Sequence, residues 1–349
     1  FALVGCGRIA KRHSELLGYQ QIKNASLVAV CDLDSSKCSL IGSQFNIPYF
    51  TNMHQMMETI DIDVVVVLTE SGNHSNNVIE LSHYGKHIVV EKPMALSLSE
   101  ADKMISACEK KNIKLFVVKQ NRFNVPVVKL KDALDKGRFG KLILGTTRVR
   151  WCRTQEYYDQ ADWRGTWALD GGVLTNQASH HIDLLEWMMG SIESVSAFGA
   201  TLLAKIETED TAVVNVKFKS GALGIIEATT ATRPKDLEGS LSILGEGGTV
   251  EIGGFAVNEM KIWNFVNKKE DDESILKKYS VNPPNVYGFG HKAYYDHVVK
   301  NLMESKSDQI VDGYEGRKSL ELIYAIYESI EKKKLVEYSS KRNECRLGK

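Results

Sequence analysis

The sequence predicts two domains of different fold class: a doubly wound parallel α/β sheet in residues 1–119, and an α+β domain with a mostly antiparallel, open sheet in residues 120–349. Up to about residue 119, short apolar runs without polar alternation are separated by helical segments, which is typical of parallel strands buried on both faces. From residue 142 on, apolar and polar residues alternate along strands joined by turns, as in an antiparallel sheet with one solvated face.

The predicted strands of the first domain are short and rich in valine, and helices separate them. One of these helices is expected at residues 54–59, and we expect Ser99 to cap the helix before the last strand. The strands are expected at residues 1–4, 27–31, 47–50, 62–68, 87–90 and 114–118. This alternation of strands and helices completes a doubly wound domain.

The second domain begins with a predicted helix at residues 125–135, and helices at residues 291–304 and 314–333 close the chain. Its strands are expected at residues 142–150, 194–200, 211–219, 222–231, 240–244, 249–252 and 260–265. Glycine-containing pairs between several of these strands have the composition of hairpin turns. The charged run at residues 268–273 is interpreted as a solvated surface segment.

Composition and charge argue against several classes of function. Lys and Arg number 44 and Asp and Glu also 44, so no basic excess favours nucleic acid or an anionic membrane surface as a partner. No apolar run approaches the roughly 20 residues of a membrane-spanning helix. The six cysteines are scattered without a C-x-x-C pair, which favours a reducing, cytoplasmic location. Because Phe1 already lies in a predicted strand, we expect a few residues to precede it.

The turn after the first strand carries a nucleotide-binding fingerprint. Gly5, Gly7 and Ala10 form G-x-G-x-x-A between a strand and a helix. The first glycine permits a tight turn, the second lets the backbone approach a pyrophosphate, and the alanine lets helix and strand pack closely. The pyrophosphate is expected at the helix N-terminus, with Arg8 and Ile9 in the same turn. This fingerprint predicts a Rossmann domain.

The end of the second strand predicts the choice of cofactor. Asp32 closes this strand 22 residues beyond Ala10, where an acidic side chain accepts hydrogen bonds from the adenosine ribose. A carboxylate there repels a 2′-phosphate, so we predict NAD as the cofactor. Two alternatives stay open: Lys37 is near enough to permit NADP, and Asp in this position also serves as a turn or helix-cap residue.

Two further loops follow parallel strands and are therefore expected at the same carboxyl edge of the sheet. Thr69 and His74 follow the fourth strand and are predicted to line the cofactor site, although His74 would also suit a helix start. Glu91, Lys92 and Pro93 follow the fifth strand. Pro93 excludes Lys92 from the helical region and permits a cis peptide bond between them. A lone triplet of this kind is more often a surface turn, and only its context favours a site.

The second domain carries a long polar and aromatic stretch from residue 163 to residue 187. The part after Asn176 is predicted to be helical, so that Asn176, His180 and Asp183 share one helix face. We expect Asp183 to hydrogen-bond His180 and to fix its tautomer. The alternative is that Asn176 only caps the helix and that His180 is a histidine of the core.

Together these motifs resemble the Gfo/Idh/MocA family of nicotinamide oxidoreductases over nearly the whole chain. The resemblance implies that Lys92 and His180 flank the nicotinamide and the reacting sugar carbon, and that homo-oligomers, dimers or tetramers, form through the second sheet. The chain departs from the family where Asn176 replaces a usual Asp and where Glu70-Ser71 replaces a common Pro-Asn.

The string from Trp163 to Gly172, followed by Asn176 and Gln177, resembles a narrower group, the WlbA/WbpB-type UDP-N-acetylglucosaminuronate 3-dehydrogenases. The resemblance implies that a UDP-N-acetylhexosaminuronate is oxidised at C3 to a 3-keto sugar for surface-polysaccharide (lipopolysaccharide O-antigen) synthesis, in some relatives with 2-oxoglutarate reoxidising NADH. The cofactor residues expected in addition to those named above are Glu91, Lys92, Trp163 and Arg164, and the substrate residues expected are Lys92, Arg122, Asn176, His180 and Tyr287.

The predicted chemistry is hydride transfer from a sugar C–H to NAD⁺, with Lys92 as the base for the hydroxyl proton and His180 as its partner. Asn176 completes the predicted catalytic set, and we hypothesise that its neutral amide stabilises the Lys92 ammonium less than Asp would. No metal is expected. Two other functions stay open: a dehydrogenase of a free polyol or sugar such as an inositol, and, from a different class, a non-catalytic NAD-sensing regulator.

Overall fold

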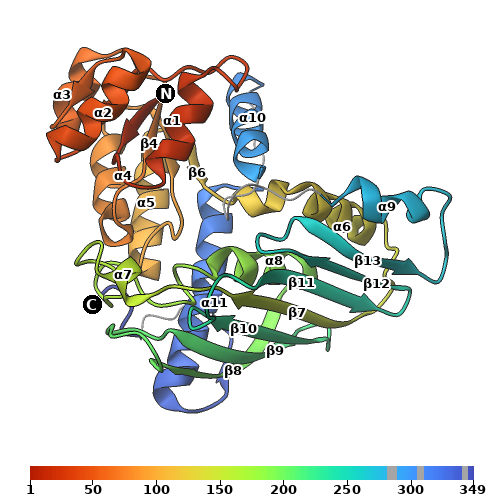
Figure 1. The fold of residues 1–349 in the computed structure, drawn as a ribbon. Helices are drawn as coiled ribbons and strands as arrows, with labels where there is room; N and C mark the ends of the chain where they lie inside the picture. Colours follow the sequence, from red (N-terminus) through yellow and green to blue (C-terminus); the bar gives the residue numbers. More distant parts are fainter. Residues whose placement is uncertain (281–288, 305–309, 340–344) are drawn as a thin grey trace. The chain divides into compact units, whose positions relative to one another are not determined.

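The chain folds into two compact units, each described here by itself (Figure 1). The computed structural model describes residues 1–280, 289–304, 310–339 and 345–349. The first unit comprises Phe1–Lys119 and His291–Arg317, and the second comprises Gln120–Gly290 and Lys318–Lys349. The predicted division after residue 119 differs from these units in one respect, because residues 291–317 group with the first.

The first unit is built on a fully parallel six-stranded sheet, which confirms the predicted fold class. The strands are β1 (Ala2–Val4), β2 (Ala29–Cys31), β3 (Tyr49–Phe50), β4 (Val64–Val67), β5 (His87–Val90) and β6 (Leu115–Val117). Their spatial order is β3-β2-β1-β4-β5-β6, so the direction of winding reverses between β1 and β4. Open α/β sheets bind ligands outside the carboxyl ends of the strands at such a reversal.

Helix α5 (Leu98–Lys110) of the first unit begins at a polar cap. Ser97, with an extended backbone, accepts a hydrogen bond from the N–H of Glu100 at 3.1 Å and caps α5. The predicted cap, Ser99, is wrong because Leu98 is already helical. The helical segments are α1 (Ala10–Gly18), α2 (Ser35–Phe45), α3 (Met53–Thr59), η1 (Ser71–Asn73), α4 (His74–Ser82), α5 (Leu98–Lys110) and α10 (Gly290–Met303).

The segment from His291 to Arg317 belongs to the first unit because it bonds to β6. The carbonyl of Val311 accepts from the N–H of Val117 at 2.7 Å, and Asp312 forms a bridge with Phe116. The partners lie almost 200 residues apart in the chain, so no local pattern in the sequence predicts this return.

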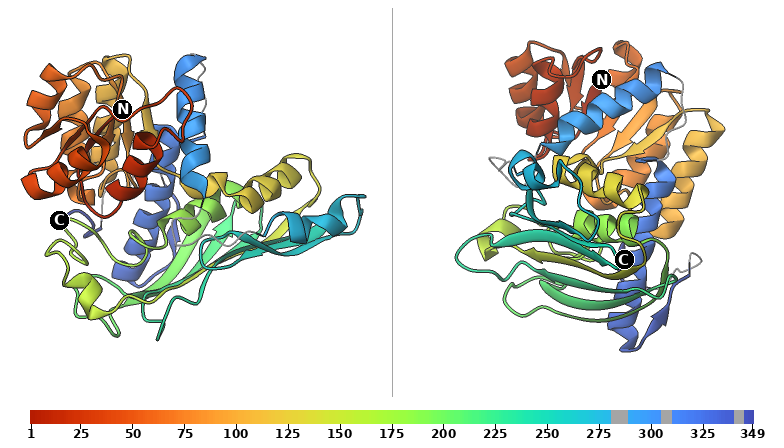
Figure 2. Two further views of the ribbon diagram at one scale, coloured as in Figure 1. Left: turned by 45° about the horizontal axis from the view of Figure 1, so that its top comes forward. Right: turned by 90° about the vertical axis from the view of Figure 1, so that its right-hand side faces the viewer.

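The second unit is built on an eight-stranded sheet in which β7 and β10 pair in parallel and the other neighbours are antiparallel. The strands are β7 (Leu142–Arg150), β8 (Ile192–Ala200), β9 (Thr211–Phe218), β10 (Leu223–Thr229), β11 (Glu238–Gly245), β12 (Gly248–Gly253), β13 (Glu259–Phe265) and β14 (Val336–Glu337). Helices α8 (Ser179–Met189) and α11 (Gly313–Lys332) lie against one face of this sheet (Figure 2). Contact is close, because a Cβ on Gly145 would meet Leu185 at 2.8 Å.

The charged run at residues 268–273 is not wholly solvated. Asp272 is buried and accepts hydrogen bonds from Arg138 at 2.7 and 2.8 Å and from Trp263 at 2.7 Å. The helical segments of this unit are η2 (Gln120–Phe123), α6 (Val125–Asp135), α7 (Gln155–Tyr158), α8 (Ser179–Met189), α9 (Asp272–Lys278) and α11 (Gly313–Lys332), the last entering the unit at Lys318. Among the described residues, no helix has the length and apolar character to cross a membrane.

Candidate active site

The glycine turn after β1 has the shape that a dinucleotide pyrophosphate requires. Gly5 has a φ of +99°, and a Cβ there would meet the carbonyl carbon of Leu68 at 2.6 Å. A Cβ on Gly7 would meet nothing within 4 Å, so the backbone borders open space. Arg8 is exposed and Ile9 half-buried in the same turn, just before α1 begins at Ala10. The residues present therefore fit a pyrophosphate at this helix N-terminus.

Asp32 is anchored to the glycine turn. One carboxylate oxygen accepts from the N–H of Cys6 at 2.7 Å, and the other accepts from the N–H of Asp34 at 2.9 Å. The side chain stays half-buried at the end of β2. Each carboxylate oxygen has a second lone pair, which leaves capacity for the ribose contacts that we predict.

His74 connects the loops that follow β4 and β5. Its Nδ1 lies 2.8 Å from the carbonyl oxygen of Pro93, and its Nε2 lies 3.0 Å from that of Thr69. Burial lowers the pKa of His74, and the two carbonyls oppose that effect without cancelling it. Thr69 in turn donates to Asn77 at 2.8 Å. His74 thus braces this edge of the sheet, and its contact with a cofactor stays a prediction.

Lys92 is half-buried directly after β5, and its peptide bond to Pro93 is cis. Its backbone N–H donates to the Glu91 carboxylate at 2.9 Å. Glu91 is itself buried and lies 3.0 Å from Nε2 of His13, a residue of α1 for which the sequence analysis predicted no role. The residue before the predicted base is therefore a buried carboxylate, and a histidine from helix α1 contacts it.

In the second unit, His180 lies in the first turn of α8 and contacts the 3₁₀ turn η2. The amide nitrogen of Gln120 is 2.9 Å from Nε2 of His180, and both side chains are buried. As placed, the amide donates to Nε2, which leaves the proton of a neutral ring on Nδ1. Gln120 is a candidate site residue that the sequence analysis missed, since nothing local connects positions 60 residues apart.

Asp183 lies on α8, about one helical turn beyond His180, and it also contacts η2. Arg122 donates from Nε and Nη2 to the two oxygens of Asp183, each at 2.8 Å, and its guanidinium lies 4.8 Å from the ring centre of Trp187. Arg and Asp are both almost fully buried. This bidentate pair fixes η2 to α8, whereas the predicted contact of Arg122 with a substrate stays a prediction.

Asn176 is not on the helix. Because α8 begins only at Ser179, the predicted shared helix face of Asn176 with His180 is wrong. The chain forms turns after Gly171 and Gly172, in which the N–H of Asn176 bonds to the carbonyl of Gly172 at 3.0 Å. The side-chain amide of Asn176 donates to the buried carboxylate of Asp170.

The aromatic part of the stretch orients Arg164. Its guanidinium lies 4.7 Å from the ring centre of Trp163 and 4.5 Å from that of Tyr157, and it donates to the Tyr157 hydroxyl at 2.7 Å. The contact of Trp163 and Arg164 with a cofactor stays a prediction. Tyr287, the remaining predicted substrate residue, lies outside the described residues.

Behind the turns of this stretch lies a buried carboxyl group that the sequence analysis also missed. Glu209 accepts from the N–H of Leu174 and from the hydroxyl of Tyr327, each at 3.0 Å. Burial raises its pKa to about 7, against the lowering effect of these hydrogen bonds. Glu209 is therefore poised to gain or lose a proton near neutral pH.

This fold and these residues define an oxidoreductase with a nicotinamide cofactor bound in a Rossmann domain. The profile "Oxidoreductase family, NAD-binding Rossmann fold" matches residues 1–119, and "Oxidoreductase family, C-terminal alpha/beta domain" matches residues 131–338. The chain belongs to the Gfo/Idh/MocA family, and it is an NAD-dependent oxidoreductase, as predicted.

Solved structures and curated relatives match nearly the whole chain. The WlbA dehydrogenase of Chromobacterium violaceum, in complex with NADH and UDP-GlcNAcA, is 44% identical, with a TM-score of 0.90 over 97% of this chain and 95% of that chain. The WlbA dehydrogenase of Bordetella pertussis, crystallised with the same two ligands, is 40% identical, with a TM-score of 0.88 over 97% and 98%. Myo-inositol 2-dehydrogenase of Thermotoga maritima is 27% identical over 348 residues, which cover 96% of this chain and 97% of the relative.

Proposed function

We propose that the chain oxidises the C3 hydroxyl of UDP-N-acetylglucosaminuronate to a 3-keto sugar, with NAD⁺ as oxidant, in the synthesis of a surface polysaccharide such as the lipopolysaccharide O-antigen. The observation that carries this proposal is the 40–44% identity, over nearly the full length, to two dehydrogenases crystallised with NADH and UDP-GlcNAcA. The inositol dehydrogenase matches over a similar length at only 27%.

The proposed division of labour follows the chemistry of the residues. The glycine turn and Asp32 hold the cofactor, which when bound supplies the acceptor for the hydride from C3. Lys92 takes the proton of the C3 hydroxyl, so that C–H and O–H bonds are lost and a carbonyl forms. His180, whose Nε2 contacts the side-chain amide of Gln120, is the proposed partner of Lys92 in this step.

The substrate test compares sugars that differ in one group. UDP-N-acetylglucosaminuronate should reduce NAD⁺, measured as NADH absorbance, whereas UDP-N-acetylglucosamine should react much more slowly because it lacks the carboxylate. Free myo-inositol, the substrate class of the 27% identical relative, serves as the competing candidate. Equal rates with the two nucleotide sugars, or activity with inositol alone, would overturn the substrate assignment and leave the fold and cofactor intact.

The proposal includes a homo-oligomer formed through the face of the second sheet opposite α8. Phe198 and Val213 pair across β8 and β9 and are 75% and 48% exposed, and Leu223 on β10 is 55% exposed. Such apolar side chains on neighbouring strands favour association of two sheets. Sedimentation should show dimers or tetramers, and Leu223→Glu should shift them toward monomers. A monomeric wild-type chain would contradict this part of the proposal.

A further inference from the structure

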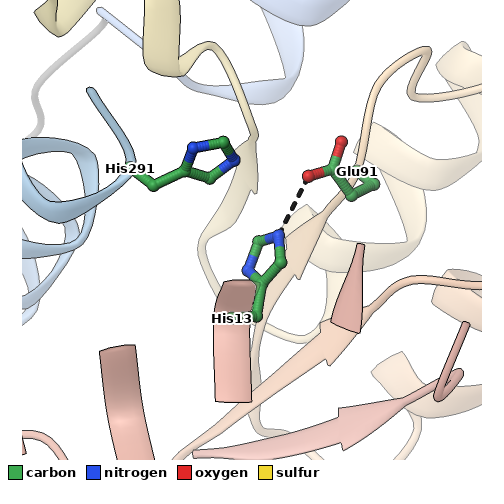
Figure 3. A group of neighbouring side chains, drawn as sticks. All are labelled: His13, Glu91 and His291. Carbon is green, nitrogen blue, oxygen red and sulfur yellow. Dashed lines mark hydrogen bonds and ion pairs between the residues drawn. The ribbon is translucent and has the colours of Figure 1, made fainter. Parts of the chain in front are cut away.

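His13, Glu91 and His291 form a buried group of side chains in the first unit, and Glu91 directly precedes Lys92. His13 on α1 and His291 on α10 point toward Glu91 at the end of β5 (Figure 3). His13 and His291 are fully buried, and Glu91 is 6% exposed. Nδ1 of His13 also lies 2.5 Å from the hydroxyl of Tyr295, on α10. Three elements far apart in the sequence thus meet at one carboxylate.

The protonation states of these groups determine which atom donates in each hydrogen bond. Burial by itself raises the pKa of Glu91, but the hydrogen bond and charge of His13, followed by His291 and Lys92, outweigh it and lower the pKa well below its usual range. An ionised carboxylate only accepts hydrogen bonds, so Nε2 of His13 donates to it. Burial holds the pKa of Tyr295 well above its usual range, so this residue stays a phenol that donates to Nδ1 when His13 is neutral.

The last contact reaches the predicted base. One oxygen of Glu91 accepts from His13 at 3.0 Å, and the other accepts from the backbone N–H of Lys92 at 2.9 Å. The carboxylate therefore fixes the peptide that carries the lysine side chain. Because a positive Lys92 favours the Glu91 carboxylate, the carboxylate in turn favours the ammonium form of Lys92. Further titratable groups that interact with Glu91 are His74, His291, Tyr294 and Tyr295.

A metal ion is not needed to explain this cluster. Potential ligand atoms of His13, Glu91 and His291 do lie within 4.8 Å of one another. However, both ring nitrogens of His13 and both oxygens of Glu91 already lie at hydrogen-bond distance from a partner. A bound ion would have to displace the bond between His13 and Glu91.

We propose that His13 and Glu91 are positioning residues that act on Lys92 through a buried hydrogen-bond chain. They orient the Lys92 peptide and keep one negative charge next to its backbone N–H, which favours the ammonium form that Lys92 adopts after taking up a proton. This role of His13 and Glu91 rests on the proposed function, in which Lys92 is the base. Their effect on the protonation of Lys92 can nevertheless be measured without any substrate.

The test is the pH dependence of Lys92 acylation by a trace reagent in the full-length, NAD-saturated protein, read by mass spectrometry of the Lys92 peptide. Glu91→Gln removes the charge and should move the midpoint of labelling about one pH unit lower, the smaller end of the effect of a close opposite charge. His13→Leu should move it the same way, because Glu91 loses its donor. His13→Gln, which still offers an N–H, should return it toward wild type.

The surface offers a matched control. His54 contacts the Tyr84 hydroxyl at 2.9 Å and Glu80 at 3.3 Å, the same chemistry at a side chain that is 45% exposed. His54→Leu should leave the Lys92 midpoint unchanged. In His13→Leu, kcat with the proposed substrate should fall at least about tenfold, while KM and the Kd for NAD change less than twofold, because only Lys92 is displaced.

An unchanged midpoint in both Glu91→Gln and His13→Leu would overturn the proposal, as would a stoichiometric metal found in wild type and lost in His13→Gln. If His13→Leu does not fold, Glu91→Gln and His13→Gln carry the test. Failure of the proposed substrate would appear separately, as an absence of NADH formation beside an intact Lys92 titration shift.

Discussion

Each unit buries a glutamate next to a predicted catalytic segment, and the two carboxyl groups respond to burial in opposite ways. Glu91 accepts from His13 and from the N–H of Lys92, and its pKa is lowered. Glu209 accepts from a backbone N–H and the Tyr327 hydroxyl, and its pKa is raised to about 7. Burial opposes the charged form of both, so the difference lies in their partners.

At Glu209, two hydrogen bonds from neutral donors do not lower the pKa below its usual range against the effect of burial. Positive or proton-bearing neighbours, His13, His291 and Lys92, do so for Glu91. Near Glu209 the charged neighbour is another acid, Asp170, which raises the pKa further. The first unit thus has a carboxyl group of lowered pKa next to its predicted base, and the second has a carboxyl group whose pKa is raised to about 7.

The largest effect on turnover is expected from replacing Lys92, the predicted base next to Glu91. Lys92→Ala should lower turnover of the proposed substrate at least about a hundredfold, the lower scale for a lost general base, with NAD binding near wild type. Lys103→Ala, on an exposed position of α5, is the matched control and should leave turnover unchanged. Ordinary turnover in Lys92→Ala would remove the assignment of the base.

His180→Ala tests whether the two predicted catalytic residues act on one step. Added to Lys92→Ala, it should lower the rate little further, because residues that act as a unit are not additive. A double mutant whose loss equals the product of the single losses would assign them to separate steps.

A smaller effect is expected from Glu209→Gln, and it should depend on pH. Since the pKa of Glu209 is raised, its stabilising contribution is complete below the pKa of about 4.5 in the unfolded chain and is lost as pH rises through about 7. The free energy of unfolding of Glu209→Gln, relative to wild type, should therefore rise between pH 4.5 and pH 8 by up to about 3 kcal/mol.

Chemical denaturation at several pH values measures this difference. Burial lowers the pKa of His181 to about 4, which changes stability in the same pH window, but it does so equally in both proteins and cancels. Glu246→Gln, at an exposed position, should give a flat difference. A flat difference for Glu209→Gln as well would show that this carboxyl group is ionised in the fold, and the contrast with Glu91 would fail.

The sequence predicts the edge of the first sheet well, because parallel strands gather the residues that follow them. The glycine turn, Asp32 and Lys92 each lie within a few residues of a strand end. It does not predict what supports them, since Tyr295 is 282 residues from His13 and Gln120 is 60 residues from His180. These contacts depend on how elements pack, which local periodicity does not encode.

The predicted helix after Asn176 failed for a local reason. Periodicity identified the helix, but the turns that follow Gly171 and Gly172 delay its start to Ser179. Asn176 therefore bonds to Asp170, a carboxylate six residues earlier, which the assumption of a shared helix face could not reveal. Helix starts are the least reliable part of such a prediction.

The smallest effect is expected at a third carboxylate, Asp32, which is only half-buried. Asp32 is held by the N–H groups of Cys6 and Asp34, and solvent reaches it. Its two oxygens keep capacity to accept hydrogen bonds from the ribose hydroxyls, as we predict. Asp32→Ala should therefore weaken the binding of NAD more than that of NADP. The ratio of the two dissociation constants should change about tenfold, the scale of one or two lost hydrogen bonds. Fluorescence titration with both cofactors measures this ratio, and an undiminished preference for NAD would show that Asp32 does not contact the ribose.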